Sequence, residues 1–559
     1  MKLSDYIVTF LQKKGIRHFF GYQGTMIAHL VDSIERNPET ENHSSYNEQG
    51  AAFAACGYAQ AKEECACAYA TSGPGAINLL SGVADAYYDS LPVIFLTGQL
   101  NTYEYSGIKG LRQQGFQETD IVAMAKPITK YAVQIRNPED IVEELNKAYH
   151  IATTGRRGPV LIDLPMNIQR SEVENPVYDM TFEDKHTDVV AAQQAADTIL
   201  EALEQAKRPV IMLGHGVDSS FSQQKLIRFA QKRQIPIITS VLAKSVLGYD
   251  HPLNFGCIGG AYGHRYANMI ANAKSDLLLC FGISLCTRQI GTKVHEFARG
   301  AKIIRIDIDP YNLQRDIHEN GINEVKLQAE TGAVIDCLAK AAAPDTEGIS
   351  DWLNVCTEIK ENLQAVDDAT PERYPNRMIA DLSDMLEDTS AIAVDVGQHM
   401  VWSYQSFKNH EGQKLLFSGG HGAMGYGLPA AIGAYYATGK PTACICGDGA
   451  LQMNIQELEW VKRENLPVKI MVMNNEALGM IRHLQRDYFD CLFAGTTDGC
   501  GFASCNFAEV AKAYGIPALR MLCDAVREEA PEFLGRGRPE TFGSYAGAWN
   551  FCISQDLSG

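Results

Sequence analysis

The sequence predicts an α/β protein of three consecutive domains, each built on a doubly wound parallel sheet. Short apolar runs alternate with helical patterns along most of the chain, which is typical of βαβ units. Two stretches, residues 169–186 and residues 340–370, have the composition of linkers. At about 150 residues per domain, the 559 residues suffice for three or four domains. We therefore predict domains at 1–168, 187–340 and 370–559.

Composition limits the classes of partner and compartment. The chain is 46% hydrophobic, enough for large cores, and its net charge of −18 argues against nucleic acid or an anionic membrane as a main partner. There is no run of about 20 apolar residues, and the N-terminus lacks the apolar core of a signal peptide. The fifteen cysteines are scattered, with no CxxC pairs at zinc spacing. We expect a reduced, cytoplasmic, globular protein.

The first predicted domain begins with a helix and a strand that ends near Phe19 and Phe20. A glycine-rich turn then opens a helix, and a later helix over residues 46–59 is rich in small residues, with Glu48 at its start. By position alone, Glu48 would complement the helix dipole. Further strands and polar loops follow at 66–78, 89–99, 115–120 and 157–165. The last of these is a buried-strand pattern that closes the domain.

The middle region repeats this alternation. After a helix come four apolar runs, at 209–214, 235–240, 276–282 and 302–310, which predict a second α/β domain. Glycine loops lie at 214–216 and 255–259, and Arg288 follows the third run. Taken alone, each loop is an ordinary turn and Arg288 is a surface arginine.

The third predicted domain opens with a helix and a strand over residues 391–396. That strand leads into three residues that could offer donors to a phosphate, Gly397, Gln398 and His399. A glycine-rich segment follows and contains Gly422 and Met424. By itself, Met424 would be a core-filling residue.

Two polar side chains then follow neighbouring strands. One apolar run ends at Gly447-Asp448-Gly449, and the next, after a helical pattern, ends at Asn474-Asn475. Parallel strands would bring Asp448 and Asn475 to the same carboxyl edge, where such sheets bind ligands. An oxygen from each suits a divalent cation that holds a diphosphate, because Mg²⁺ takes about six hard oxygens and phosphates supply some of them. The alternative is an ordinary strand-to-helix turn with Asp448 as its N-cap.

The Gly-Asp-Gly triplet, the spacer and the Asn-Asn pair resemble the thiamine diphosphate motif. The segments from Gly21 to Pro165 resemble, in order and approximate spacing, the first domain of the acetolactate synthase large (catalytic) subunit family. The resemblance runs from about residue 1 to about residue 520. It implies the thiamine diphosphate enzyme fold, with a pyrimidine-binding, a central and a diphosphate-binding α/β domain.

The resemblance also assigns roles to residues. Glu48 would be the acid that hydrogen-bonds the cofactor's pyrimidine ring, and Met424 the bulky residue that bends the cofactor. The implied catalytic residues are Glu48 and Gln117; the cofactor-binding residues are Gly397, Gln398, His399, Gly422, Met424, Gly449 and Ala450; and the metal-binding residues are Asp448, Asn475 and Ala477. Phe116 and Arg288 would lie near the substrate.

The implied activity is the decarboxylation of a 2-oxo acid such as pyruvate, dependent on thiamine diphosphate and Mg²⁺, with transfer to a second carbonyl. Glu48 of one subunit would face Asp448 and Asn475 of another, so a homodimer is the minimum unit, and a homotetramer also fits. The family's central domain carries flavin, which makes FAD a candidate second cofactor. Related enzymes bind other nucleotides there, or none.

Three features depart from the family pattern. Cys286 and Thr287 stand where the family has two acidic residues, which weakens the inference for flavin and for Arg288. Leu484 replaces a tryptophan that helps to select the acceptor, so a preference for 2-oxobutyrate does not carry over. The tail from about residue 521, including 535–544, lacks the strand pattern that the family has there. The tail is then a loop, a lineage-specific end or the product of a shifted reading frame, and if the closing strand is missing, the third domain loses part of its core.

Two alternatives stay open. The first is a catalytically impaired homologue, which the tail motivates. The second is a relative that uses a sugar-linked ketone as acceptor, or that performs another chemistry, as an oxidase or an acyl-CoA decarboxylase does.

Overall fold

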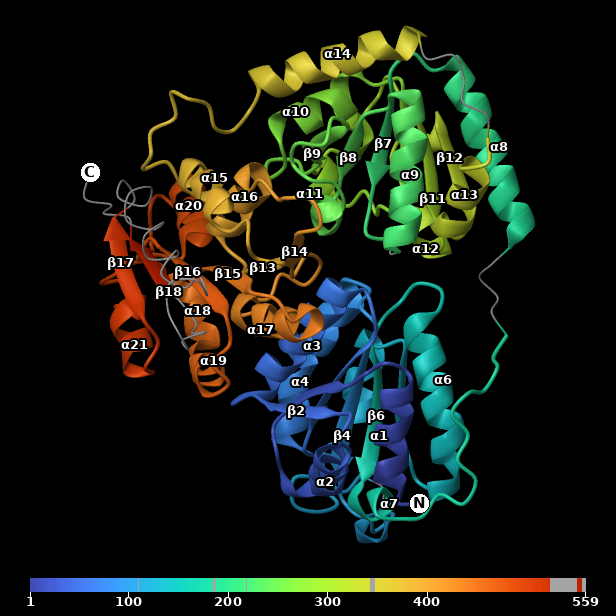
Figure 1. Cartoon of the computed structure of the whole chain (residues 1–559), viewed down its shortest axis with the longest axis vertical. Coiled ribbons are helices and arrows are strands. Elements are labelled where there is room, and N and C mark those ends of the chain that lie inside the picture. The colour runs from blue at the N-terminus through green and yellow to red at the C-terminus, as the bar shows by residue number, and fades with distance from the viewer. Residues whose placement is uncertain (109, 184–187, 218, 342–346, 523–549, 555–559) are drawn as a thin grey trace.

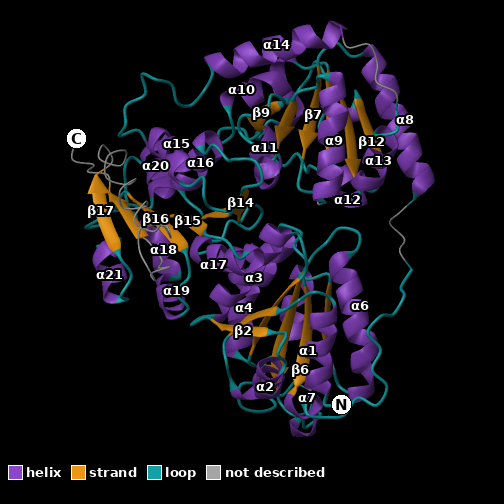
Figure 2. Ribbon diagram, in the orientation of Figure 1, coloured by secondary structure: helices purple, strands orange, loops and turns teal. Residues whose placement is uncertain are grey.

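Three six-stranded parallel sheets follow one another along the chain in the computed structural model (Figure 1), which confirms the predicted fold class. The structure describes all residues except 109, 184–187, 218, 342–346, 523–549 and 555–559. Helices flank each sheet, as parallel strands require for their crossover connections (Figure 2). Within the described residues, no helix has both the length and the apolar character needed to cross a membrane.

The first sheet has the order β2-β1-β3-β4-β6-β5. Its strands are β1 (His18–Gly21), β2 (Glu41–Ser44), β3 (Ala66–Ala70), β4 (Val93–Gln99), β5 (Tyr131–Gln134) and β6 (Val160–Pro165). Its helices are α1 (Leu3–Lys13), α2 (Ala28–Arg36), α3 (Glu48–Lys62), α4 (Pro74–Tyr88), α5 (Ile121–Ala125), α6 (Ile141–Thr153) and α7 (Met166–Gln169). The strands β3, β4 and β6 are buried along their whole length, which explains their mostly apolar sequences; the buried Asp163 of β6 accepts hydrogen bonds from Thr97 and Gln99 of β4.

The central sheet has the order β12-β11-β10-β7-β8-β9. Successive strands are added on one side of β7 up to β9 and on its other side from β10 onward, so the strand order switches between β7 and β10. Its strands are β7 (Pro209–Leu213), β8 (Ile237–Thr239), β9 (Asn254–Cys257), β10 (Leu277–Phe281), β11 (Lys302–Asp307) and β12 (Glu324–Gln328). Its helices are α8 (Val189–Gln205), α9 (Ser220–Arg233), α10 (Arg265–Asn268), α11 (Thr287–Ile290), α12 (Pro310–Gln314) and α13 (Thr331–Leu338). The helix expected in the second linker is α14 (Glu347–Asn362), and its Trp352 packs into the core of this domain and donates to the Pro209 carbonyl.

The third sheet has the order β14-β13-β15-β16-β18-β17, the same pattern as the first. Its strands are β13 (Ala391–Val394), β14 (Lys414–Phe417), β15 (Thr442–Gly447), β16 (Val468–Asn474), β17 (Ala518–Leu522) and β18 (Asn550–Ser554). Its helices are α15 (Pro375–Met385), α16 (Gln398–Ser406), α17 (Gly427–Thr438), α18 (Asp448–Met453), α19 (Leu458–Arg463), α20 (Gly479–Tyr488) and α21 (Phe507–Ala513).

The expectation that the tail supplies no closing strand is wrong. The strand β18 pairs in parallel with β16 on one side and with β17 on the other. It fills the position that β6 fills between β4 and β5 in the first sheet. The predicted irregular segment 535–544 lies outside the described residues.

The first and third domains share one apolar core, and α3 packs lengthwise on α17. The two helix backbones come into contact at glycines: a Cβ on Gly433 would lie 1.8 Å from the Ala54 carbonyl oxygen, and one on Gly57 would lie 2.3 Å from that of Ala430. Asp89, at the end of α4, accepts the backbone N–H groups of Gly419 and Gly420 at 2.8 and 2.6 Å. These contacts fix the first domain against the third.

Candidate active site

The carboxyl ends of β15 and β16 lie side by side, with Gly447 paired to Met473. Asp448 therefore begins α18 next to Asn475, which directly follows β16, as the sequence predicted. The Ala477 N–H donates to Asn475 Oδ1 at 3.2 Å and also lies close enough to the Asp448 carboxyl to act on it. The structure thus brings together the three predicted metal ligands, Asp448, Asn475 and Ala477.

Only one of the two oxygens of the Asp448 carboxyl has a hydrogen-bond partner among the described residues. Its Oδ1 accepts the Gly449 N–H at 2.9 Å, whereas its Oδ2 is buried and has no hydrogen-bond partner among the described residues. Burial raises the pKa of Asp448 to about 6, although nearby backbone N–H groups act to lower it. A buried carboxylate oxygen without a partner is costly unless a cation or donor occupies the space beside it. This donor set fits a divalent cation that prefers hard oxygen ligands.

Gln398, at the start of α16, joins this group. Its Oε1 accepts from Asn475 Nδ2 at 3.0 Å, and its Nε2 lies 3.2 Å from the His483 ring. A Cβ on Gly479 would lie 1.9 Å from Gln398 Oε1, so any larger residue there would force the Gln398 side chain to move. A cavity of about 350 Å³ opens here, between Gln398, Asn475 and Ala477 and the basic side chains of Arg482, His483 and Arg486. Its lining suits an anionic group.

The other two residues of the predicted phosphate-binding turn differ from Gln398. The His399 ring is 4% exposed and lies against the end of β15, where a Cβ on Gly447 would be 3.0 Å from its Nδ1. Burial lowers the pKa of His399 to about 4, so the ring is neutral at pH 7. Gly397 is the N-cap residue of α16. The His399 side chain therefore supports the strand end from below.

Small residues make a floor beside the Asp448 carboxyl. A Cβ on Gly449 would lie 2.6 Å from Leu478 Cδ2 and 3.4 Å from Met424 Cε, so Met424 does lie over this turn. Ala450 is buried, and Gly422 has φ of +70°, a conformation that favours glycine. Of the predicted cofactor-binding residues, Gly449 and Met424 thus lie next to each other.

Glu48 lies at the start of α3 and is 8% exposed. Asn78 Nδ2 donates to Glu48 Oε2 at 3.0 Å, and a Cβ on Gly75 would lie 2.8 Å from Oε1. The helix begins here because the Asn47 side chain accepts the Gln49 N–H at 3.0 Å. These partners of the Glu48 carboxyl belong to the first domain. The next residue, Gln49, accepts a hydrogen bond at 3.2 Å from Asn454, at the end of the helix that Asp448 begins.

The turn that holds Glu48 also holds Gln117. A Cβ on Gly73 would lie 2.7 Å from the Gln117 carbonyl oxygen, and Gln117 has φ of +62°, a strained value for a residue with a side chain. Phe116 is 80% exposed, so the described residues of a single chain leave it largely uncovered. Glu48 and Gln117 are brought close to one turn, but Phe116 points to solvent.

All three parts of the chain match known family descriptions. Residues 1–124 match "Thiamine pyrophosphate enzyme, N-terminal TPP binding domain", residues 196–338 the central domain, and residues 395–539 the "C-terminal TPP binding domain". The chain belongs to the thiamine pyrophosphate enzyme family. The matched C-terminal segment contains the Asp448–Asn475 edge.

Relatives of this thiamine pyrophosphate enzyme align over most of its length. The "Probable acetolactate synthase large subunit" of Methanocaldococcus jannaschii is 34% identical, over 96% of this chain and 91% of its own. The Escherichia coli (strain K12) "Acetolactate synthase isozyme 1 large subunit" is 32% identical, over 95% and 90%. The rice "Probable acetolactate synthase 2, chloroplastic" (Oryza sativa subsp. japonica) is 35% identical, over 93% and 79%.

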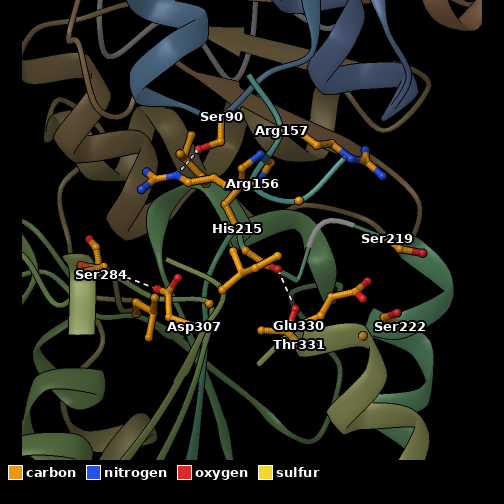
Figure 3. A pocket seen from close by; sticks show the side chains of 18 of the residues that line it. Ser90, Arg156, Arg157, His215, Ser219, Ser222, Ser284, Asp307, Glu330 and Thr331 are labelled. Atoms are coloured by element: carbon orange, nitrogen blue, oxygen red, sulfur yellow. Dashed lines mark hydrogen bonds between the residues drawn. The ribbon is translucent and has the colours of Figure 1, made fainter. Parts of the chain in front are cut away.

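A second cavity of this thiamine pyrophosphate enzyme, of about 650 Å³, lies between the first and central domains (Figure 3). It opens at the carboxyl ends of β7, β10 and β11. This is the switch point of the strand order, where ligands commonly bind to such sheets. Arg156 and Arg157 line it from the first domain, and His215, Asp307 and Glu330 line it from the central domain. Arg156 donates to Ser90 Oγ and to Asp309, and Arg157 donates to the Glu63 carbonyl. Of the two glycine loops expected near a flavin, 214–216 contributes His215 and Gly216 to the lining, and 255–259 does not.

Arg288 does not belong to either cavity. Its side chain is exposed, and its guanidinium lies 5.2 Å from the centre of the Tyr262 ring, at the boundary of the central and third domains. The neighbouring Gln289 lines the larger cavity instead. A role for Arg288 at the substrate stays a prediction.

Sequence reasoning missed Glu457, which follows α18. It is fully buried, its Oε2 has no partner among the described residues, and a Cβ on Gly50 would lie 2.6 Å from its Oε1. Burial raises the pKa of Glu457 to about 7, although backbone N–H groups of Tyr46 and Asn47 act to lower it. It therefore touches the segment that leads into Glu48. The burial of Glu457 becomes visible only when α3 is packed on the third domain. The helical pattern of the sequence does not say which side of the helix another domain covers.

Proposed function

We propose that this chain decarboxylates a 2-oxo acid, pyruvate being the first to test, and joins the remaining acyl group to a second carbonyl, as an acetolactate synthase does. The observation that carries the proposal is the buried, unpartnered Asp448 Oδ2 beside Asn475 and Ala477, within the segment that matches a TPP binding domain. The relatives named as acetolactate synthases support the reaction class. An impaired homologue is the less favoured reading, because β18 completes the third sheet.

Asp448, Asn475 and Ala477 would hold Mg²⁺ on the diphosphate, with Gly449 and Ala450 at the helix start and the turn 397–399 beside them. Thiamine diphosphate, when bound, supplies an electron sink for the carbanion that the loss of CO₂ leaves. Met424, with Gly422 in the same turn, would support the cofactor from the side where it now covers Gly449.

Glu48 would be the acid that exchanges a proton with the pyrimidine ring. Asn78 holds Oε2, and Gly75 leaves space at Oε1, so the carboxyl keeps one orientation. The buried, alanine-rich helix behind it excludes water from this side. Gln117 and Phe116 would contact the substrate. We also propose a homodimer, as the family resemblance implies, in which Glu48 of one subunit faces Asp448 and Asn475 of the other.

The direct test measures CO₂ release from pyruvate by the purified protein. We expect turnover only when thiamine diphosphate and Mg²⁺ are both present. The substitution Glu48→Gln should lower it by at least about 100-fold, because removing a positioned acid typically costs that much. Glu143→Gln, at an exposed position of α6, is the matched control. Equal turnover in Glu48→Gln would contradict the assignment of the acid, and tight cofactor binding without turnover in wild type would favour an impaired homologue.

Mass spectrometry of the products, with pyruvate and a panel of acceptors, would identify the second carbonyl. The basic side chains near Gln398 and the loss of the family's tryptophan at Leu484 are reasons to include a sugar-linked ketone beside 2-oxo acids.

For the larger cavity we propose a nucleotide ligand, with FAD as the first candidate. Its size, its place at the switch point of the central sheet and its two arginines support this. A yellow protein whose extract contains stoichiometric FAD would establish the flavin. A colourless protein that binds ADP at this cavity would instead indicate another nucleotide.

A further inference from the structure

A cluster of metal-ligating side chains lies on the edge of the first sheet, outside the site described above. The strands β1 and β2 are parallel neighbours, and their register places His18 opposite Glu41 and Phe20 opposite His43. Paired residues and residues two apart share one face of a sheet. The sheet itself therefore places the side chains of His18, Glu41 and His43 on the same face.

The ligand atoms of these side chains converge. His18 Nδ1 lies 2.9 Å from His43 Nε2, and Glu41 Oε2 lies 3.7 Å from the first nitrogen and 3.8 Å from the second. All of the candidate ligand atoms lie within 4.8 Å of one another. We propose that His18, His43 and Glu41 form a site for a divalent transition-metal ion, with zinc as the ion that two imidazoles and one carboxylate suit best.

Coordination requires only a small movement of the rings. Two nitrogens at about 2.0–2.1 Å from one tetrahedral ion are about 3.4 Å apart, so the imidazoles would separate by about 0.5 Å. The Glu41 side chain is 66% exposed, which lets its carboxylate move in and leaves the remaining coordination position to water. Without an ion, the same geometry is an imidazole–imidazole hydrogen bond, and the experiment must separate these two states.

A second carboxylate orients His43. Glu464 Oε2 lies 3.5 Å from His43 Nδ1, the nitrogen that does not face His18, and Arg463 donates to Glu464 Oε1 at 2.9 Å. A carboxylate on the far nitrogen is the usual support of a metal-binding histidine, because it fixes the ring and leaves the other nitrogen's lone pair for the ion. The Tyr436 ring packs against the face of the His43 imidazole, with the two ring centres 3.8 Å apart.

The site would have a structural role. His43 belongs to β2, which leads within five residues to Glu48, whereas Glu464 follows α19 of the third domain. Arg463 also donates to the Ser44 carbonyl at 2.5 Å. An ion at His18 and His43 would hold the segment before Glu48 against α19, independently of any cofactor at Asp448.

The test uses the full-length protein, which is first freed of metal by chelation and then saturated with thiamine diphosphate and Mg²⁺. This protein is titrated with Co²⁺ and, separately, with Zn²⁺. We expect one Co²⁺ per chain with the intense visible absorption of a tetrahedral site, displaced by Zn²⁺, and a Zn²⁺-dependent rise in Tm. The substitutions His18→Asn and Glu41→Gln should each weaken Zn²⁺ binding by at least tenfold and abolish the rise. Glu464→Gln should weaken it about tenfold, as the loss of a supporting carboxylate does.

Glu39→Gln, an exposed change on the approach to β2, is the matched control and should bind Zn²⁺ like wild type. If His18→Asn does not fold, Glu41→Gln decides, because the Glu41 side chain is largely solvated. The proposal is overturned if wild type shows no tetrahedral Co²⁺ spectrum, or if Glu41→Gln and wild type bind Zn²⁺ equally. Because binding is read from metal spectra and Tm, its failure is separate from any failure of the proposed enzyme activity.

Discussion

At the residue scale, four carboxyl groups among the described residues each keep one buried oxygen without a hydrogen-bond partner: Asp85, Glu324, Asp448 and Glu457. The last two belong to the third domain, near the candidate active site. Asp448 was predictable, because the ends of neighbouring parallel strands must meet at one sheet edge. Glu457 was not, because its burial depends on α3, which lies about 400 residues earlier in the chain and packs on the third domain only in the folded protein. The local sequence pattern thus predicts which residues lie at a strand end. It does not predict which residues are buried by a helix that is distant in the sequence.

For Asp448→Asn, we expect Mg²⁺-dependent binding of thiamine diphosphate to weaken by at least about 10- to 100-fold, because a neutral amide replaces the charged oxygen ligand. Titration calorimetry with and without Mg²⁺ measures this. The exposed change Asp498→Asn is the control, and unchanged affinity in Asp448→Asn would remove this residue from the metal site.

Glu457 makes stability depend on pH. Its pKa is raised in the folded state from 4.5 to about 7 by burial, so the folded protein holds a proton that the unfolded chain has lost. The stabilisation by that proton is complete below pH 4.5 and is lost as the pH rises through 7, with a total of up to about 3 kcal/mol. Urea unfolding at pH 5 and pH 8 should show a smaller loss in Glu457→Gln than in wild type. Part of the loss stays in both, because burial also raises the pKa values of Asp89 and Asp448. The exposed change Glu201→Gln should behave like wild type; an equal pH response in Glu457→Gln would show that another group is responsible.

At the element scale, the strands that could be predicted are those that lie inside a sheet, because burial on both faces gives a mostly apolar run, as in β15 and β16. The strand β18 was missed. Its five residues include asparagine and serine, and what defines it as a strand is pairing with β16 and β17 on both sides. The domain limits that we drew from composition stay predictions.

The contact of α3 with α17 depends on glycine. For Gly433→Ala, the new Cβ would fall 1.8 Å from a backbone oxygen of Ala54, which cannot rotate away as a side chain could. We expect a loss of about 3 kcal/mol in the free energy of unfolding, at the upper end of overpacking effects. Gly300→Ala, where a Cβ meets nothing within 4 Å, is the matched control. Equal stability of the two variants in denaturant unfolding would mean that the helices separate at little cost.

At the scale of the whole molecule, the proposed homodimer makes activity depend on assembly, because one subunit would supply Glu48 and the other Asp448 to each site. Phe116, exposed in one chain, belongs to the same question, since the sequence predicted it near substrate. Neither residue pattern nor a single chain's fold specifies which surface a second copy covers.

Mixed dimers test the shared site. If Glu48→Gln and Asp448→Asn chains are co-expressed, a mixed dimer contains one intact pairing of Glu48 with Asp448. Random mixing should then restore about a quarter of wild-type activity, since half of the dimers are mixed and each has one working site. Differently tagged chains allow the mixed species to be isolated. Activity no higher than that of either variant alone would show that each chain builds its own site.

The position of β18 has a consequence for how the protein is made. It is translated after both of its neighbours, β16 and β17, and enters between them. Until residue 554 has left the ribosome, both strands present open edges, which are prone to pair with other chains. A stop codon shortly before residue 550 would therefore release a chain with every predicted metal ligand in its sequence and a sheet that cannot close around them.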